Sequence, residues 1–210
     1  MRLTLAALTA LAAASAFAAT ASAQSSSASH DHAAMGHAAH GQAVAMDHAA
    51  MMPRATPGQT GQAAIINGAG AEIGKATLTQ GPTGLLIKVE ATGLTPGWHG
   101  IHIHATGQCA APFTSAGAHI NHTDPKTPHG LLNAQGPDDG DLPNLYAAAD
   151  GSAHGEFFTP RARISQDGPG QWLWDADGSA LVIHANPDDH HSQPIGGAGD
   201  RVACAVLSAN

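Results

Sequence analysis

Short apolar runs separated by Gly, Pro, Asn and Asp make up most of the chain after residue 60. In one of them Leu85, Ile87 and Val89 alternate with the charged Lys88 and Glu90. Since successive side chains of a β-strand point to opposite faces, this run predicts a strand with one buried face. Comparable runs lie at residues 63–66, 74–78, 98–104, 156–159, 180–184 and 201–207. Helix-length periodic patterns are absent, and the regular spacing of the runs predicts an all-β sandwich or barrel.

Two long segments without apolar periodicity follow predicted strands, at residues 105–146 and 185–200. Connections in compact domains are usually short, and long structureless loops usually carry function. We therefore expect the functional residues to lie on these loops and at the strand ends beside them.

The first 23 residues carry one charge at Arg2, then an apolar Ala/Leu-rich stretch, and end on Ala21-Ser22-Ala23. This pattern predicts a secretory signal peptide cleaved near Ala23, and hence a periplasmic or otherwise exported protein. A membrane anchor is the alternative, but Thr and Ser interrupt the apolar stretch. No later stretch approaches the roughly 20 apolar residues that cross a bilayer, so we expect a mature protein without a membrane span.

Residues 24–60 are rich in Ala, Ser, Gly, His and Met and almost lack branched aliphatic side chains. Such a segment buries too little apolar surface to offset the entropy of ordering, which predicts a disordered tail. Imidazole and thioether groups are suited to copper. The tail is therefore either a metal-binding segment or a linker that is merely His-rich; its candidate ligands are His30, His32, Met35, His37, His40, Met46, His48, Met51 and Met52.

The chain has a formal charge of −8 and only eight Lys and Arg residues, which are not clustered. The basic patch that nucleic-acid binding requires is therefore absent from the sequence. The two cysteines, Cys109 and Cys204, favour one disulfide over metal thiolates in an exported chain, with two buried free thiols as the alternative.

Four histidines stand where predicted strands meet the long loops. His102 and His104 are two residues apart and so share one face of a strand, opposite Ile101 and Ile103. An H-x-H pair alone is a weak signal. His184 ends another strand, and His119 lies in the first loop. Four imidazoles without a thiolate favour copper or zinc.

A second set of donors follows His119 along the first loop. His129 comes first, and Asp138, Asp139 and Asp141 come after it. Nitrogen and carboxylate oxygen ligands are compatible with a second cation, such as zinc, beside the first.

At this point the sequence, over residues 61–207, resembles the Cu/Zn superoxide dismutases of the bacterial exported type. The resemblance rests on six motifs in the family's order. They are HGIHIH at 99–104, TSAGAH at 114–119, PHGLLN at 128–133, GDLPNL at 140–145, LVIH at 181–184 and GDRVAC at 199–204.

The resemblance implies a domain over residues 61–210 with the fold of an eight-stranded antiparallel Greek-key barrel, related to immunoglobulin-like sandwiches, with two long functional loops. It implies disproportionation of superoxide to dioxygen and hydrogen peroxide at a redox-active copper. Copper and zinc are the implied cofactors. A homodimer is compatible with the family, but no interface is readable from the sequence.

The resemblance also assigns roles residue by residue. The copper ligands are His102, His104, His119 and His184, and the zinc ligands include His119, which bridges the two metals, His129 and Asp141, while Asp138 stands at the position of the remaining zinc ligand. Arg201 is the arginine that guides and holds the anion, and His119 supplies a proton to the product. Asp188 is a carboxylate that joins a copper-ligand and a zinc-ligand histidine, and Cys109 and Cys204 form the family's disulfide.

Two positions depart from the family pattern. Asp138 replaces the third zinc histidine, and Asn121-His122 replaces the usual Asn-Pro. An aspartate oxygen and the imidazole nitrogen nearest the backbone both lie two bonds beyond Cβ, and zinc accepts both atom types at similar distances. We therefore expect zinc to be retained. The alternatives are a copper-only dismutase with a vestigial zinc site and a periplasmic copper-buffering protein.

Overall fold

The structure is a computed structural model, which describes residues 54–209. The signal peptide predicted for residues 1–23, and the tail predicted for residues 24–60 except its last seven residues, lie outside the described residues. Within those seven, Ala55 is buried and its N–H donates to the carbonyl of Pro82 at 3.1 Å. The first strand begins at Thr60.

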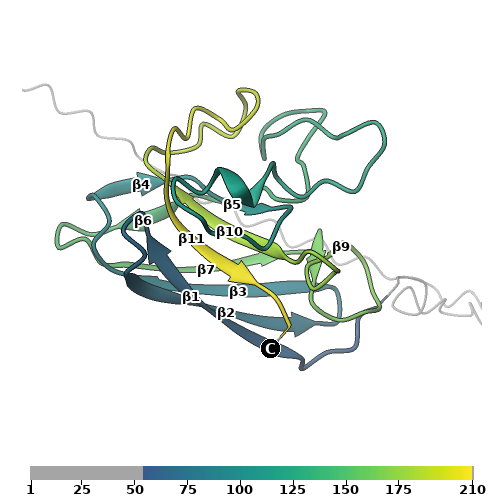
Figure 1. Cartoon of the computed structure of the whole chain (residues 1–210). Helices are drawn as coiled ribbons and strands as arrows, with labels where there is room; N and C mark the ends of the chain where they lie inside the picture. The colour runs from purple at the N-terminus through teal and green to yellow at the C-terminus, as the bar shows by residue number, and fades with distance from the viewer. Residues whose placement is uncertain (1–53, 210) are drawn as a thin grey trace, which may run out of the picture. The chain divides into compact units, whose positions relative to one another are not determined.

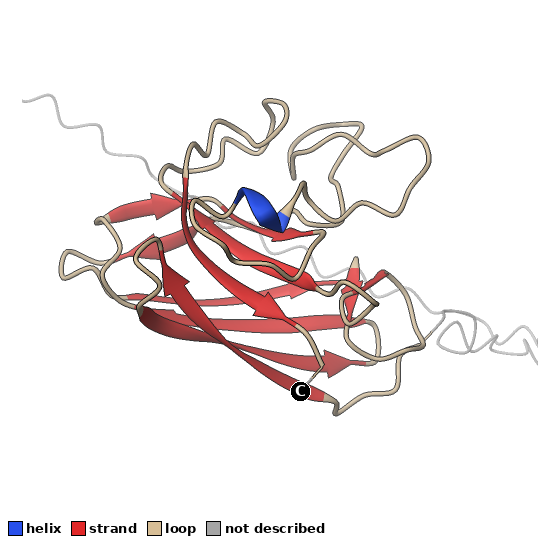
Figure 2. Cartoon of the chain, in the orientation of Figure 1, coloured by secondary structure: helices blue, strands red, loops and turns tan. Residues whose placement is uncertain are grey.

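Nine strands form one antiparallel sheet that curls into a nearly closed barrel (Figures 1 and 2). The strand order around the sheet is β4-β6-β7-β3-β2-β1-β11-β10-β5. The strands are β1 (Thr60–Asn67), β2 (Glu72–Gly81), β3 (Gly84–Ala91), β4 (Gly97–His99), β5 (Ile101–His104), β6 (Leu145–Ala147), β7 (Ala153–Thr159), β10 (Ser179–His184) and β11 (Arg201–Leu207). The all-β prediction is confirmed.

The barrel has one more strand than the eight expected because residues 97–104 are interrupted at Gly100. On one side of this glycine β4 pairs with β6, and on the other side β5 pairs with β10. The N–H of Gly100 donates to the carbonyl of Asn186 at 2.8 Å, and its carbonyl accepts the N–H of His184 at 2.8 Å. A Cβ at Gly100 would lie 2.8 Å from the Cβ of Ala198, so a side chain does not fit there.

The core is built from inward-facing residues of the strands, which alternate with exposed residues along β3. Leu85, Ile87 and Val89 of β3 are buried, whereas Lys88 and Glu90 are exposed and pair with charged residues of neighbouring strands. Burial of one such aliphatic side chain stabilises the fold by about 1.5–3 kcal/mol. The alternation expected from the sequence is therefore confirmed.

Three short elements had no sequence signal. These are β6 in the main sheet and a separate parallel pair, β8 (Ala162–Arg163) and β9 (Gln171–Trp172). Strands of two or three residues are too short to show a period of two. A single turn of 3₁₀ helix, η2 (Thr114–Ala116), lies within the first long loop. Among residues 54–209 no helix has the length and apolar character to cross a membrane.

The two long loops, residues 105–144 and 185–200, both rise from the same side of the barrel beside β5 and β10 (Figure 1). A disulfide joins Cys109 in the first loop to Cys204 in β11, with the Cα atoms 5.7 Å apart. The predicted disulfide is confirmed. It ties the segment that precedes η2 and His119 to the barrel wall.

Candidate metal centre

Strand β5 provides the frame on which the other histidines are placed. His102 and His104 lie on one face of β5, while Ile101 and Ile103 are buried in the barrel core. Both parts of the first long loop return to this strand. His104 faces His119 in one isolated β-bridge, and His102 faces Asp141 in another.

Backbone hydrogen bonds of Ile103 hold these two returning segments. Its N–H donates to the carbonyl of Gly140 at 2.9 Å, and its carbonyl accepts the N–H of Ile120 at 2.9 Å. A Cβ at Gly140 would lie 2.3 Å from the carbonyl oxygen of Ile103, so the close approach requires glycine. Ile103 therefore fixes the register of the two returning segments, one of which carries His119 and the other Asp138 and Asp141.

Four imidazoles converge beside β5. Potential ligand atoms of His102, His104 and His184 lie within 4.8 Å of one another, and the ring of His119 lies 4.3 Å from that of His102 and 5.0 Å from that of His104 between centroids. His102 Nδ1 and the Nε2 atoms of the other three are buried without a hydrogen-bond partner. Buried nitrogens without partners are costly, so this arrangement fits a bound metal ion.

The opposite ring nitrogens of three of these histidines are fixed by hydrogen bonds. His102 Nε2 donates to Asp188 Oδ2 at 2.8 Å, His104 Nδ1 to the carbonyl of Gly117 at 2.9 Å, and His184 Nδ1 to the carbonyl of Gly199 at 3.0 Å. Such partners orient ligand imidazoles and set their tautomers. The free nitrogen of each ring is consequently the one that faces the other rings.

Burial keeps three of these rings neutral. It lowers the pKa of His102 to about 3, that of His104 to about 2 and that of His184 to about 4. A neutral imidazole has a lone pair available for a metal, whereas an imidazolium has none. At neutral pH the three nitrogens are therefore ready to act as ligands.

The second group is built around His119, with His129, Asp138 and Asp141, whose potential ligand atoms lie within 4.8 Å of one another. His119 Nδ1 is 2.9 Å from Asp138 Oδ2 and 3.6 Å from Asp141 Oδ1, and His129 Nδ1 contacts Asp141 Oδ1. Tetrahedral zinc ligands at about 2.0–2.2 Å would lie about 3.3–3.6 Å apart. Small adjustments would therefore place all four around one ion.

The charges of this group differ from those of the first. Burial alone would raise the pKa of Asp141, but hydrogen bonds from His119 and His129 outweigh it and hold the pKa well below its usual range. Burial alone would lower the pKa of His129, but Asp141 and Asp188 outweigh it and raise the pKa to about 10. Buried carboxylates that contact imidazoles, as Asp138 and Asp141 do, suit a divalent cation, which would take the place of protons on the rings.

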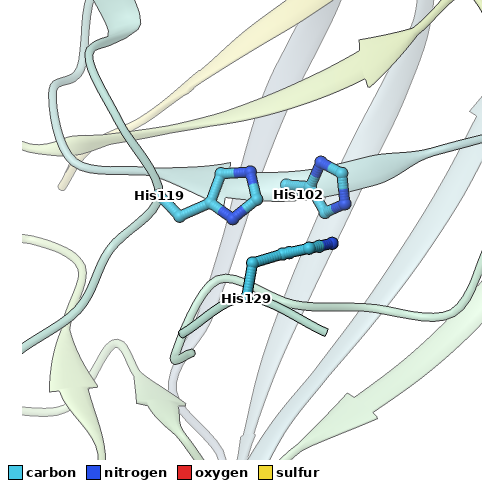
Figure 3. A group of neighbouring side chains, drawn as sticks. All are labelled: His102, His119 and His129. Carbon is cyan, nitrogen blue, oxygen red and sulfur yellow. The ribbon is translucent and has the colours of Figure 1, made fainter. Parts of the chain in front are cut away.

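Three of the rings, His102, His119 and His129, are drawn in Figure 3, where they lie around a common space. The ring centroid of His129 lies 5.4 Å from that of His102 and 5.3 Å from that of His119. His119 is the member shared by both groups, since its Nε2 faces the first and its Nδ1 the second.

Asp188 hydrogen-bonds to one histidine of each group. Its Oδ2 accepts from His102 Nε2 at 2.8 Å, and its Oδ1 accepts from His129 Nε2 at 3.1 Å. The side-chain amide of Asn144 holds the backbone of Asp188. Its Nδ2 donates to the carbonyl of Asp188 and its Oδ1 accepts from the N–H of Asp188, each at 2.8 Å. A Cβ at Gly196 would lie 1.6 Å from Asp188 Oδ1, so this position requires glycine.

Asn144 is a supporting residue that sequence reasoning missed. It is 44 positions from Asp188 and reaches it only through the folded loops. Its place in the GDLPNL motif at 140–145 marks the residue but does not reveal its partner.

Arg201 lies at the start of β11, beside the first group. Its guanidinium donates to the carbonyls of Phe113 and Gly117, both at 2.7 Å. Together with His104, His119 and Asp138 it lines a cavity of about 580 Å³. Lys126 also lines this cavity, and sequence reasoning missed it because a single Lys in a polar loop is unremarkable. The cavity gives the two groups access to solvent and carries positive charge at its wall.

The sequence matches the family described as copper/zinc superoxide dismutase (SODC) over residues 72–207. The chain belongs to this family. Among its relatives, the protein named superoxide dismutase [Cu-Zn] of Caulobacter vibrioides is 53% identical over 146 residues, which cover 69% of this chain and 83% of the relative. The superoxide dismutase [Cu-Zn] 2 of Aquifex aeolicus is 43% identical over 147 residues, covering 69% and 84%.

Solved structures of family members share the fold. The P104H mutant of a SOD-like protein from Bacillus subtilis superimposes with a TM-score of 0.67 at 34% identity, covering 72% of this chain and all of that one. The Cu/Zn superoxide dismutase from Brucella abortus gives a TM-score of 0.58 at 28% identity, covering 71% of this chain and all of that one. The resemblance stated from the sequence motifs is therefore confirmed.

Proposed function

We propose that this member of the family disproportionates superoxide at a copper ion held by His102 Nδ1 and by Nε2 of His104, His119 and His184. The observation that carries the assignment is the convergence of these four buried nitrogens without hydrogen-bond partners. Four imidazole ligands suit copper, and the set contains no thiolate or carboxylate.

The second ion of the proposed centre is zinc, held by Nδ1 of His119 and His129 and by carboxylate oxygens of Asp138 and Asp141. Asp138 stands where the family pattern has a histidine, and its Oδ2 reaches within 2.9 Å of His119 Nδ1. The mixed nitrogen and oxygen set is one that zinc accepts. This placement favours zinc over the copper-only alternative, for which no ligands would be needed here.

In the mechanism, bound copper supplies the one-electron redox chemistry, and zinc, which has no redox chemistry, supplies charge. One superoxide loses an electron and leaves as dioxygen, and a second gains an electron and two protons and leaves as hydrogen peroxide. When copper is not bound to it, His119 Nε2 would hold one of these protons and deliver it to the reduced product. Arg201 holds the anion in the cavity beside His104 and His119.

Arg201 suits this role because its backbone acceptors fix its guanidinium without neutralising it. Phe113 and Gly117 offer carbonyl oxygens and not carboxylates. The full positive charge therefore remains available to an anion in a protein whose net charge is −8. A fixed cation of this kind raises both the encounter rate and the residence of the substrate.

Metal analysis of the purified mature protein, reconstituted with copper and zinc and assayed for superoxide dismutation, tests the proposal. We expect one copper and one zinc per chain and catalytic dismutation. Asp138→Ala should retain copper and lose zinc, while Asp124→Ala, which removes an exposed carboxylate of the same loop, should retain both. Copper without zinc in the parent protein, or full zinc in Asp138→Ala, would reject the zinc site.

We further propose that the protein acts in the periplasm or another exported location. The signal-like residues 1–23 support export, and so does the Cys109–Cys204 disulfide, since disulfides persist in oxidising compartments. Residues 24–53, with their His and Met side chains, would then serve to collect copper for the site. Sequencing the N-terminus of the exported protein tests the proposal of export, with Gln24 expected as the first residue.

A further inference from the structure

His122 and Asp139 form a hydrogen-bonded pair beside the proposed zinc site without belonging to it. Asp139 Oδ2 accepts from His122 Nδ1 at 2.6 Å and from the backbone N–H of His122 at 2.7 Å. The carboxylate is 7% exposed, and the imidazole is 55% exposed. The mechanism proposed above uses neither residue.

This pair joins the chain segment of His119 to the segment that carries Asp138 and Asp141. His122 follows His119 by three residues, and Asp139 directly follows Asp138. The turn at 138–141 is closed on itself, because the N–H of Asp138 donates to Asp141 Oδ2 and the N–H of Gly140 donates to Asp138 Oδ1, both at 3.0 Å. A constraint on Asp139 is therefore transmitted to Asp138.

The segment that presents His122 is itself held in place. The side chain of Asn121 closes residues 121–127 into a loop, because its Oδ1 accepts from Thr123 Oγ1 at 2.8 Å and its Nδ2 donates to the carbonyl of Thr127 at 2.7 Å. The N–H of Thr127 also donates to Thr123 Oγ1 at 2.9 Å. His122 thus offers Asp139 a fixed partner.

We propose that the His122–Asp139 pair positions Asp138 for zinc. It holds the 138–141 turn so that the Asp138 carboxylate faces His119 Nδ1. Asp138 stands at the position where the family pattern has a histidine. Of the two departures of the sequence from that pattern, His122 makes this contact and Asp138 directly precedes its other member. Partners that orient metal ligands in this way typically contribute about 10- to 100-fold to metal affinity. The proposal rests on the zinc site proposed above.

The test compares His122→Ala with His122→Asn, because the Asn amide nitrogen occupies the place of imidazole Nδ1 and can still donate to Asp139. His154→Ala, which removes an exposed imidazole from the outer face of β7, is the control. Zinc affinity is measured by competition with a chromophoric chelator. Copper affinity and the melting temperature of the metal-free proteins are measured in parallel.

We expect His122→Ala to lower zinc affinity by about tenfold or more, with copper affinity and metal-free melting temperature unchanged. His122→Asn should recover most of the loss, and His154→Ala should match the parent. Parental zinc affinity in His122→Ala, or an equal loss in the Ala and Asn variants, would overturn the positioning role and leave the zinc site standing. A parent protein that binds no zinc would overturn the zinc site and this role together.

Discussion

Arg201 and His104 donate to the same acceptor, the carbonyl oxygen of Gly117, at 2.7 and 2.9 Å. One backbone group therefore positions both the cation that is proposed to hold superoxide and an imidazole that is proposed to hold copper. Gly117 has a φ of +77°, a left-handed conformation that favours glycine. The Cys109–Cys204 disulfide ties this loop to β11. The backbone of the loop therefore sets the distance between the proposed anion site and the proposed copper site.

Arg201→Ala should retain copper, since Gly117 can still accept from His104, but should slow dismutation by about tenfold or more because the anion loses its fixed cation. Ionic strength should affect the variant less than the parent, because salt screens a steering charge that the variant lacks. Decay of superoxide followed by stopped flow at several salt concentrations measures both effects. Lys75→Ala, on the far β2–β3 surface, is the control. An unchanged rate in Arg201→Ala would contradict the assignment.

The double variant Cys109→Ser/Cys204→Ser should lose about 4 to 5 kcal/mol of unfolding free energy on the chain-entropy model, since the disulfide spans 95 residues. Denaturant unfolding of the metal-free proteins measures this change. The variant should also bind copper more weakly, because the loop that carries His119 and Gly117 is no longer tied to β11. A loss below about 1 kcal/mol would show that the unfolded chain is hardly constrained by the bond.

Asp188→Asn should weaken binding of both metals, because Asp188 orients His102 in one group and His129 in the other. Losses of about 10- to 100-fold are expected for a partner of this kind. Chelator competition for copper and for zinc, each in turn, provides the measurement. Asp189→Asn changes the neighbouring exposed carboxylate, which contacts only its own loop, and should leave both affinities at the parental value. If only one metal is affected, the bridging role of Asp188 is wrong.

Removal of residues 24–53 should not alter turnover of the fully metallated enzyme, because the cut ends before Ala55, which contacts the domain. The truncated protein should acquire copper more slowly when copper is scarce, since the His and Met side chains of the segment would raise the local metal concentration. The rate of activation of the metal-free proteins at limiting copper is the quantity to compare. Equal rates would leave the segment as a linker.

Much of the fold was predictable because burial imposes a period of two on each long strand. Leu85, Ile87 and Val89 identify β3 in this way, and the same period places His102 and His104 on one face of β5. The interruption at Gly100 was not predictable, because it depends on contacts with Asn186 and Ala198 that form only in the folded barrel.

The candidate site was likewise only partly predictable. Its ligands are identifiable from the family motifs in the sequence. The contacts of Asn144 with Asp188 and of His122 with Asp139 join residues of irregular loops. No periodic pattern governs such loops, so these supporting residues became visible only in three dimensions.

In the proposed metal centre, His119 joins a copper site to a zinc site through its two ring nitrogens. Electron paramagnetic resonance of the protein loaded with Cu(II), with either zinc or paramagnetic Co(II) as the second ion, tests it most directly. If the imidazole bridges the ions, the Cu(II) signal should be strong beside zinc and largely lost beside Co(II), because the electron spin of Cu(II) couples to that of Co(II) through the ring. An undiminished Cu(II) signal in a protein shown to hold both copper and cobalt would contradict the bridged centre.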